Sequence, residues 1–195
     1  REPVIFWLAE HVREVVATDL YGNETWTTNN GSEAPADIVQ DADKYCPRTF
    51  QKDRIRFEIA DGTKLPYEDS SYDFCWSLSS IEHFGGAEAA AEAIREMGRV
   101  TKTGGIICIA SEYLFDDGNQ PHPEYFTRKQ IEEVLIPADR KLKLVNGMSW
   151  ILPPQEYLDN PINTQTADVH RRKRHVVLKH GDFYWTSFML FFKKI

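Results

Sequence analysis

Three short segments combine the residue types and spacing used to bind a nucleotide-like ligand, and each follows an apolar run typical of a strand. They are Asp19 with Leu20, Asp61 with Gly62, and residues 77–83. In open α/β sheets ligands bind at the carboxyl ends of the strands, so these positions are candidates for a site. Asp19 stands where an acid can accept hydrogen bonds from both hydroxyls of a ribose. A carboxylate at Asp61 can meet an adenine amino group, and Gly62 lets the backbone approach the ring.

The third segment offers small and apolar side chains that can line a methionine-like tail. The candidates are Ser77, Leu78, Ser79 and Ile81. Each of the three segments also has an ordinary structural interpretation: a strand-end residue, an Asp-Gly turn and a polar loop without a further role. Their joint order along the chain is what favours a ligand site.

The elements that would position these segments alternate along the chain. Strands are predicted at residues 14–19, 55–60, 72–78, 106–110, 141–150 and 183–192, and helices at 4–9, 34–45, 87–100 and 127–136. This alternation predicts an α/β fold, a Rossmann-like doubly wound and mostly parallel sheet. The last two strands have no convincing crossover helix between them, so an antiparallel strand at the C-terminal edge is expected.

The segments 61–73, 80–84 and 99–105 together resemble class I S-adenosylmethionine (SAM)-dependent methyltransferases, in the small-molecule, type 11-like subgroup. The resemblance implies methyl transfer from SAM to a small-molecule acceptor by in-line displacement. It also implies that Asp19 contacts the ribose, that Asp61 and Gly62 contact the adenine, and that residues 77–81 face the methionine portion.

The front of the chain departs from this pattern, because the Gly-x-Gly loop of the family is absent. In dinucleotide-binding folds the acid follows the glycines by about 20 residues, and the 18 residues before Asp19 nearly exhaust that distance. We therefore expect residues 1–195 to be a single methyltransferase domain that lacks its first strand and glycine loop.

The methyl group of a sulfonium cation is already activated, so an enzyme mainly has to align the acceptor with it and exclude water. A base is needed only when the acceptor must lose a proton. His83, beside Glu82 at the predicted methyl site, is the candidate catalytic residue, and His122 follows the next strand. Alternatively, His83 is a structural loop residue. The basic run 170–175 is either a solvated loop or a sign of an anionic acceptor.

Two other functions fit parts of the sequence. Residues 125–129 spell the Tyr-x-x-x-Lys of short-chain dehydrogenases, with Ser111 upstream, which would imply NAD(P). However, Pro123 and the helix cap expected at Thr127 place Tyr125 before the helix begins. The second alternative is a methyltransferase-like binding domain that has lost catalysis.

Composition narrows the possible partners. The 195 residues are 42% hydrophobic, with a net charge of −7 that disfavours nucleic-acid binding. The apolar runs are shorter than the roughly 20 residues that a membrane span needs. The three cysteines show neither metal-ligand spacing nor an even number, which predicts a reducing cytoplasmic location and no metal site. The sequence indicates no particular oligomeric state.

Overall fold

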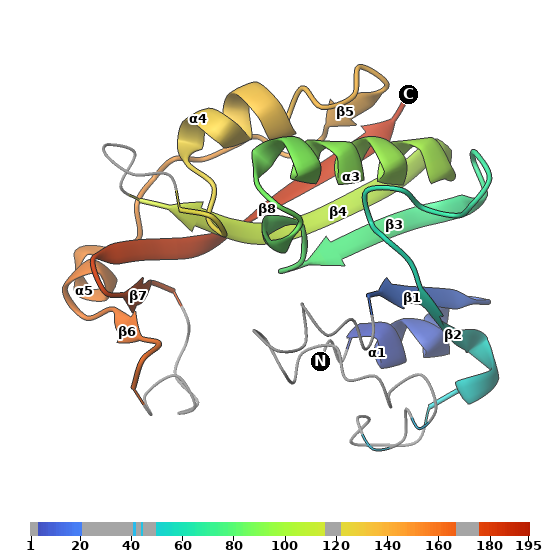
Figure 1. Ribbon diagram of the computed structural model, residues 1–195, viewed down its shortest axis with the longest axis horizontal. Coiled ribbons are helices and arrows are strands. Elements are labelled where there is room, and N and C mark those ends of the chain that lie inside the picture. Colours follow the sequence, from blue (N-terminus) through green and yellow to red (C-terminus); the bar gives the residue numbers. More distant parts are fainter. Residues whose placement is uncertain (1–3, 21–40, 42–43, 45–49, 116–121, 167–175) are drawn as a thin grey trace. The chain divides into compact units, whose positions relative to one another are not determined.

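The computed structural model describes residues 4–20, 41, 44, 50–115, 122–166 and 176–195 (Figure 1). The chain divides into two compact units, Arg1–Pro66 and Tyr67–Ile195. The helix predicted at 34–45 lies outside the described residues except at 41 and 44, and the basic run 170–175 lies outside them entirely.

The N-terminal unit is a helix followed by a pair of parallel strands. Its elements are α1 (Val4–His11), β1 (Val15–Asp19), the short 3-10 helix η3 (Lys52–Arg54) and β2 (Ile55–Ile59). β1 and β2 pair in parallel from Val15 opposite Ile55 to Asp19 opposite Ile59. The Arg54 guanidinium donates to the carbonyl of Ala9 at 3.3 Å, near the C-terminal end of α1 where a positive charge is favourable. The predicted helix and both strands are confirmed.

The C-terminal unit is built on a mixed sheet. Its elements are β3 (Tyr72–Leu78), η4 (Ile81–His83), α3 (Ala87–Val100), β4 (Thr101–Leu114), α4 (Arg128–Gln130), η5 (Ile131–Leu135), β5 (Leu142–Leu144), α5 (Gln155–Asp159), β6 (Ile162–Asn163), β7 (Leu178–His180) and β8 (Phe183–Lys194). The strand order is β3-β4-β8-β7-β6, with β5 also paired to β8. β3 is parallel to β4, and β8 is antiparallel to β4 and β5. The antiparallel strand expected near the C-terminus is therefore present, and the arrows of β4 and β8 run in opposite directions (Figure 1).

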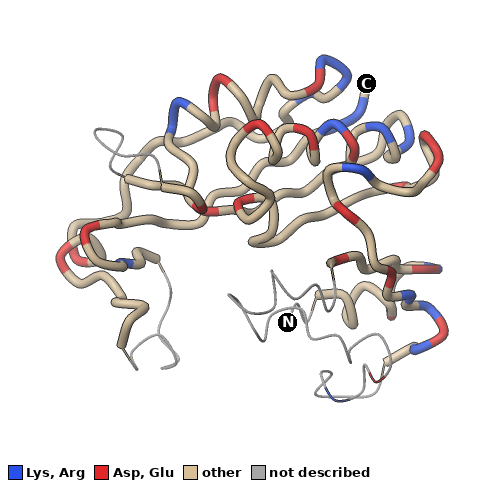
Figure 2. The backbone as a smooth tube through the Cα atoms, viewed as in Figure 1, with Lys and Arg blue, Asp and Glu red and all other residues tan. Residues whose placement is uncertain are grey.

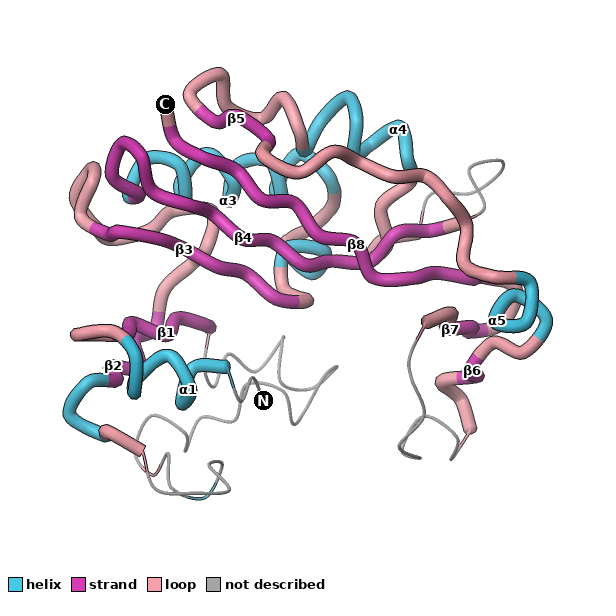
Figure 3. The backbone as a smooth tube through the Cα atoms, turned by 180° about the vertical axis from the view of Figure 1, so that it is seen from behind, coloured by secondary structure: helices cyan, strands magenta, loops and turns pink. Residues whose placement is uncertain are grey.

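The core of this unit lies between the helices and one face of the sheet. Ile107 and Ile109 on β4 are 0% exposed and pair with Phe192 and Leu190 on β8, so these four side chains point to the same face. They join one cluster with the apolar side of α3 and η5. Figure 3 shows the strands with α3 and α4 behind them. Small buried residues on α3, such as Ala90, let the helix approach the strands closely.

The largest differences between the predicted and observed strand boundaries are in β4 and β5. β4 begins at Thr101, five residues before its predicted start. The extra residues form a bulge inside the strand, because Tyr72 pairs with Thr101 whereas Phe74 already pairs with Ile106. β5 ends at Leu144, although the prediction extended it to residue 150. Beyond that point the Asn146 side chain replaces the strand ladder, accepting from the N–H of Phe191 at 2.8 Å and donating to the carbonyl of Met189.

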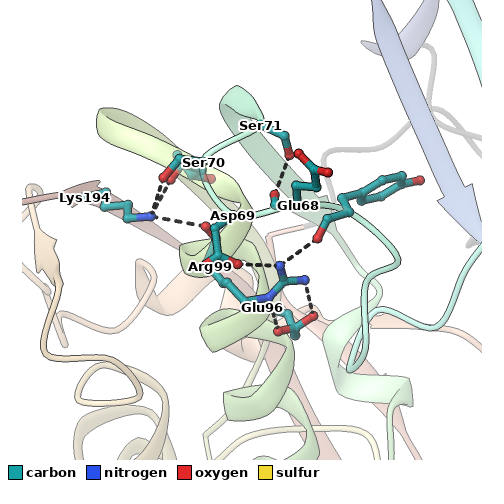
Figure 4. Close-up of polar contacts among 9 residues, drawn as sticks. Glu68, Asp69, Ser70, Ser71, Glu96, Arg99 and Lys194 are labelled. Atoms are coloured by element: carbon teal, nitrogen blue, oxygen red, sulfur yellow. Dashed lines mark hydrogen bonds and ion pairs between the residues drawn. The ribbon is translucent and has the colours of Figure 1, made fainter.

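A buried lysine closes the C-terminal end of α3 (Figure 4). Lys194, on β8, is 8% exposed and its ammonium group donates to the carbonyls of Thr101 at 2.6 Å and Arg99 at 3.2 Å. The Arg99 guanidinium bonds Asp69 at 2.9 Å, which lowers the pKa of that carboxyl. Figure 2 shows further Lys and Arg residues gathered at this end of the unit. Lys194 thus joins β8 to the junction of α3 and β4, and Arg99 joins that junction to the turn before β3.

Candidate functional site

The two carboxylates predicted in the N-terminal unit follow neighbouring strands at the same edge. The N–H of Ala60 donates to the backbone carbonyl of Asp19 at 3.1 Å, which brings the ends of β1 and β2 together. Asp19 is half-buried, and its Oδ1 accepts from the N–H of Leu20 at 2.6 Å. Parallel pairing thus places Asp19 and Asp61 at the carboxyl ends of adjacent strands, where ligands bind in this type of fold.

Asp61 forms the turn that its Asp-Gly sequence also suggested. Its Oδ1 accepts from the N–H of Thr63 at 2.8 Å and from the Thr63 hydroxyl at 2.7 Å. The backbone carbonyl of Asp61 accepts from Lys64. Asp61 itself is exposed and Gly62 is half-buried. The turn therefore fixes the direction of this carboxylate while leaving the residue accessible.

In the C-terminal unit, the loop after β3 is tied back to β4. Ser79 has a φ of +47°, an uncommon value for a residue with a side chain, and its N–H donates to the carbonyl of Ala110 at 2.9 Å. The Ser80 hydroxyl donates to the carbonyl of Leu78. Ser77 and Leu78 are half-buried and Ser79 is exposed. The predicted serine segment therefore consists of the end of β3 and a turn that is hydrogen-bonded to β4.

The turn η4 continues this loop into the interior. Ile81 is 0% exposed and packs in the same core as Ala90 and Ile94 of α3. Glu82 is only 2% exposed, and its Oε2 accepts from the hydroxyl of Ser111 at 2.7 Å. Burial raises the pKa of Glu82 to about 7, and the bond from Ser111 only partly opposes that effect.

His83 points from η4 toward the segment that precedes α4. Its side chain is 17% exposed, and its Nδ1 lies 3.6 Å from Oε1 of Glu124. The two groups form an ion pair when the imidazole is protonated. Glu124 is the more exposed of the two side chains, at 44%. The geometry places the candidate base next to an acid that can stabilise its charged form.

Sequence reasoning missed two further groups at this edge, Glu112 and Tyr125. Glu112 lies near the end of β4, beyond the predicted end of that strand at residue 110; burial raises its pKa, while bonds from the hydroxyls of Ser187 and Ser79 oppose the shift. Phe126 bonds β4 through the carbonyl of Glu112 at 2.9 Å, which brings Tyr125 alongside. Burial, followed by the charges of nearby glutamates, raises the pKa of Tyr125 to about 12, so its phenol stays a neutral donor at ordinary pH.

Four rings form an aromatic stack beside these acids. His122 stacks on Tyr125 with centroids 3.9 Å apart, Tyr125 stacks on Trp185 at 4.4 Å, and Phe183 meets His122 edge-on at 4.7 Å. The Nδ1 of His122 accepts from the N–H of Glu124, so the neutral ring carries its proton on Nε2. Burial lowers the pKa of His122.

The dehydrogenase alternative is not supported by this geometry. Thr127 forms the predicted capping box with Gln130, so Tyr125 precedes the helix. Lys129 is 79% exposed and pairs with Glu133 at 4.0 Å. Ser111 is 0% exposed and bonded to Glu82.

Within the described residues, no group of three or more His, Cys, Asp or Glu side chains is arranged to hold a metal ion. No helix among them is both long enough and apolar enough to cross a membrane.

Comparison with known proteins gives short but clear sequence similarities. Methyltransferase GfsG of Streptomyces halstedii is 39% identical over 59 residues, covering 30% of this chain and 20% of the relative. The 27-O-demethylrifamycin SV methyltransferase of Amycolatopsis mediterranei (strain S699) is 39% identical over 62 residues, covering 32% of this chain and 22% of the relative. The similarity thus spans about a fifth of the length of these two proteins.

Solved structures share the fold at low sequence identity. The 4+2 cyclase SpnF has a TM-score of 0.52 and 16% identity, covering 98% of this chain and 78% of that one. A SAM-dependent methyltransferase from Methanosarcina mazei has a TM-score of 0.52 and 13% identity, covering 97% and 85%. A family model described as "Methyltransferase domain" matches residues 4–109, more than half of the chain. The chain belongs to the class I SAM-dependent methyltransferase family.

Proposed function

We propose that this protein transfers the methyl group of SAM to a small-molecule acceptor by in-line displacement. The observation that carries the proposal is the family match over residues 4–109, which includes every segment predicted to bind the cofactor. The acids and the histidine at the carboxyl ends of β3 and β4 support it, because they provide polar chemistry at the sheet edge where this fold binds ligands.

For the cofactor we propose a role for each predicted residue. Asp19, with the adjacent Leu20, accepts from the ribose hydroxyls, and Asp61 with Gly62 contacts the adenine. Ser77, Leu78 and Ser79 face the methionine portion, together with the backbone of Ile81, whose side chain is in the core. These residues contain the required hydrogen-bond acceptors and small side chains, so they fit the cofactor chemically.

When bound, SAM supplies an electrophilic methyl group on a sulfonium cation. The protein must then orient the acceptor and, for a hydroxyl acceptor, remove its proton. We propose that His83 accepts that proton while the acceptor oxygen forms its bond to the methyl carbon and the carbon–sulfur bond breaks. Glu124, 3.6 Å from the imidazole, would stabilise the resulting imidazolium. The Amycolatopsis relative, whose name describes an O-demethylated substrate, supports an oxygen acceptor.

We further propose that the acceptor is uncharged near His83. An anionic acceptor was suggested by the basic run 170–175, which is outside the described residues. Among the described residues, Glu82, Glu112 and Glu124 all lie on the segments around His83, and ionised carboxylates there would repel an anion. The aromatic stack offers an apolar surface beside them.

For the domain, we propose that residues 1–195 belong to one methyltransferase domain. The family match over residues 4–109 supports this assignment, because it includes elements of both compact units.

Thermal-shift titration of the full-length protein tests the function. S-adenosylhomocysteine should stabilise the protein and NAD should not, since a ligand stabilises only the state it binds. Asp19→Ala should abolish the shift, whereas Asp53→Ala, an exposed acid in the same unit, should keep it. Methyl transfer is then read from homocysteine release in an acceptor screen. Binding without turnover of any acceptor would favour the catalytically inactive alternative, and binding of neither ligand would contradict the proposal.

A further inference from the structure

Glu82 is a buried acid to which the proposed mechanism assigns no role. Its carboxyl group is buried together with the hydroxyl group of Ser111, since Glu82 is 2% exposed and Ser111 is 0% exposed. Burying such a polar pair is costly unless both groups are hydrogen-bonded, and the 2.7 Å bond between them meets that need. A carboxyl group is a poor choice for a purely apolar position, so its retention in the core calls for a function.

The location of the bond indicates what that function is. The loop after β3 is attached to β4 at three consecutive residues: the N–H of Ser79 donates to the carbonyl of Ala110, the hydroxyl of Ser111 donates to Glu82, and the hydroxyl of Ser79 bonds Glu112. The first attachment is a backbone bond that any residue except proline could make. The second depends on two buried side chains. His83 directly follows the second attachment, and the residues proposed to face the cofactor precede it.

We propose that Glu82 is a positioning residue, whose hydrogen bond with Ser111 holds the turn Ile81–His83 on β4 and thereby sets the orientation of the His83 imidazole and of the Ser77–Ser79 segment. The inference deepens the proposed function and rests on it for its ligand-binding readout. Its structural readout is independent of that function.

The charged surroundings make this attachment sensitive to pH. Among the described residues, the titratable groups that act on or adjoin Glu82 are Glu112 on β4, Glu124 and Tyr125 before α4, and His83 on the same turn. The buried side chains of α3 are all apolar. Burial and the two glutamates raise the pKa of Glu82, whereas the bond from Ser111 lowers it. Protonation near neutral pH therefore changes whether the anchor is a carboxylate or a carboxylic acid.

Nuclear magnetic resonance of the full-length protein with labelled histidine and glutamate tests the coupling. The ring signals of His83, assigned with His83→Asn, should show a step at the pH where the Glu82 carboxyl titrates. Glu82→Gln should remove that step. Ser111→Ala should move it to higher pH, because it deletes the bond that favours the ionised form. Ser71→Ala, which removes a hydroxyl bond of the same 2.7 Å length near the start of β3, should leave it unchanged.

Ligand binding provides the second readout. Ser111→Ala should weaken S-adenosylhomocysteine binding about tenfold, the equivalent of one hydrogen bond, because the loop loses its buried side-chain anchor on β4. Glu82→Gln should stay within about threefold, since its amide oxygen can still accept from Ser111. His83 signals that ignore the state of Glu82 would overturn the proposal, as would unchanged binding in a folded Ser111→Ala protein. If the wild-type protein binds no S-adenosylhomocysteine, the proposed function fails, and the His83 signals still decide the positioning role.

Discussion

Replacing the buried Lys194 with methionine should destabilise the protein strongly. The substitution keeps a long side chain but deletes the ammonium group, which donates to the carbonyls of Thr101 at 2.6 Å and Arg99 at 3.2 Å. A hydrogen bond to a charged group contributes roughly 1.5 to 3 kcal/mol, so two such bonds contribute about 3 to 6 kcal/mol. The methionine variant no longer buries a charged group, and the desolvation cost that disappears offsets part of the lost hydrogen-bond energy. The expected net loss of stability is about 2 to 4 kcal/mol.

Urea unfolding followed by circular dichroism measures this loss. In a chain of this size it corresponds to a decrease in Tm of about 5 to 15 °C. Lys193→Met is the matched control, because Lys193 is the exposed neighbour on β8 and should cost less than about 0.5 kcal/mol. If the Lys194 variant loses no more stability than the Lys193 variant, the assignment of Lys194 as the cap of α3 is refuted.

Three further substitutions test the packing and the buried acid. Gly105→Ala should destabilise by more than about 2 kcal/mol in the same urea assay, since its Cβ would lie 2.5 Å from the backbone oxygen of Asp73, whereas Gly147→Ala, with nothing within 4 Å, should be near neutral. Thr127→Ala should cost about 1 kcal/mol through loss of the capping box, and an unchanged midpoint would contradict its role. Glu82 has a pKa of about 7 when folded against 4.5 ordinarily, so the stability conferred by its protonated form is full below pH 4.5 and lost as pH rises through 7. Glu82→Gln should therefore gain about 3 kcal/mol on wild type between pH 4 and pH 8, by the linkage of 1.36 kcal/mol per pKa unit, and a constant difference would contradict the raised pKa.

Much of the candidate site could be predicted from the positions of residues after strands. Asp19 and Asp61 end up at the same sheet edge because neighbouring parallel strands align their carboxyl ends. The identity of the acids around His83 could not be predicted in the same way. Glu112 was missed because the predicted strand stopped at residue 110, and only the pairing of β4 with β8 extends it to Leu114.

The sequence by itself determined the local elements. The helix at residues 87–100 matches its predicted bounds, and Thr127 and Gln130 form their capping box, because periodicity and capping depend on residues within a few positions of each other. Tertiary structure alone decided that Glu82 is buried against a serine 29 residues away, and that Lys194 caps α3 through the carbonyl of Arg99, 95 residues earlier. Burial and hydrogen bonding between such distant residues follow from how the strands pair, and they determine which acid is ionised and which lysine is structural.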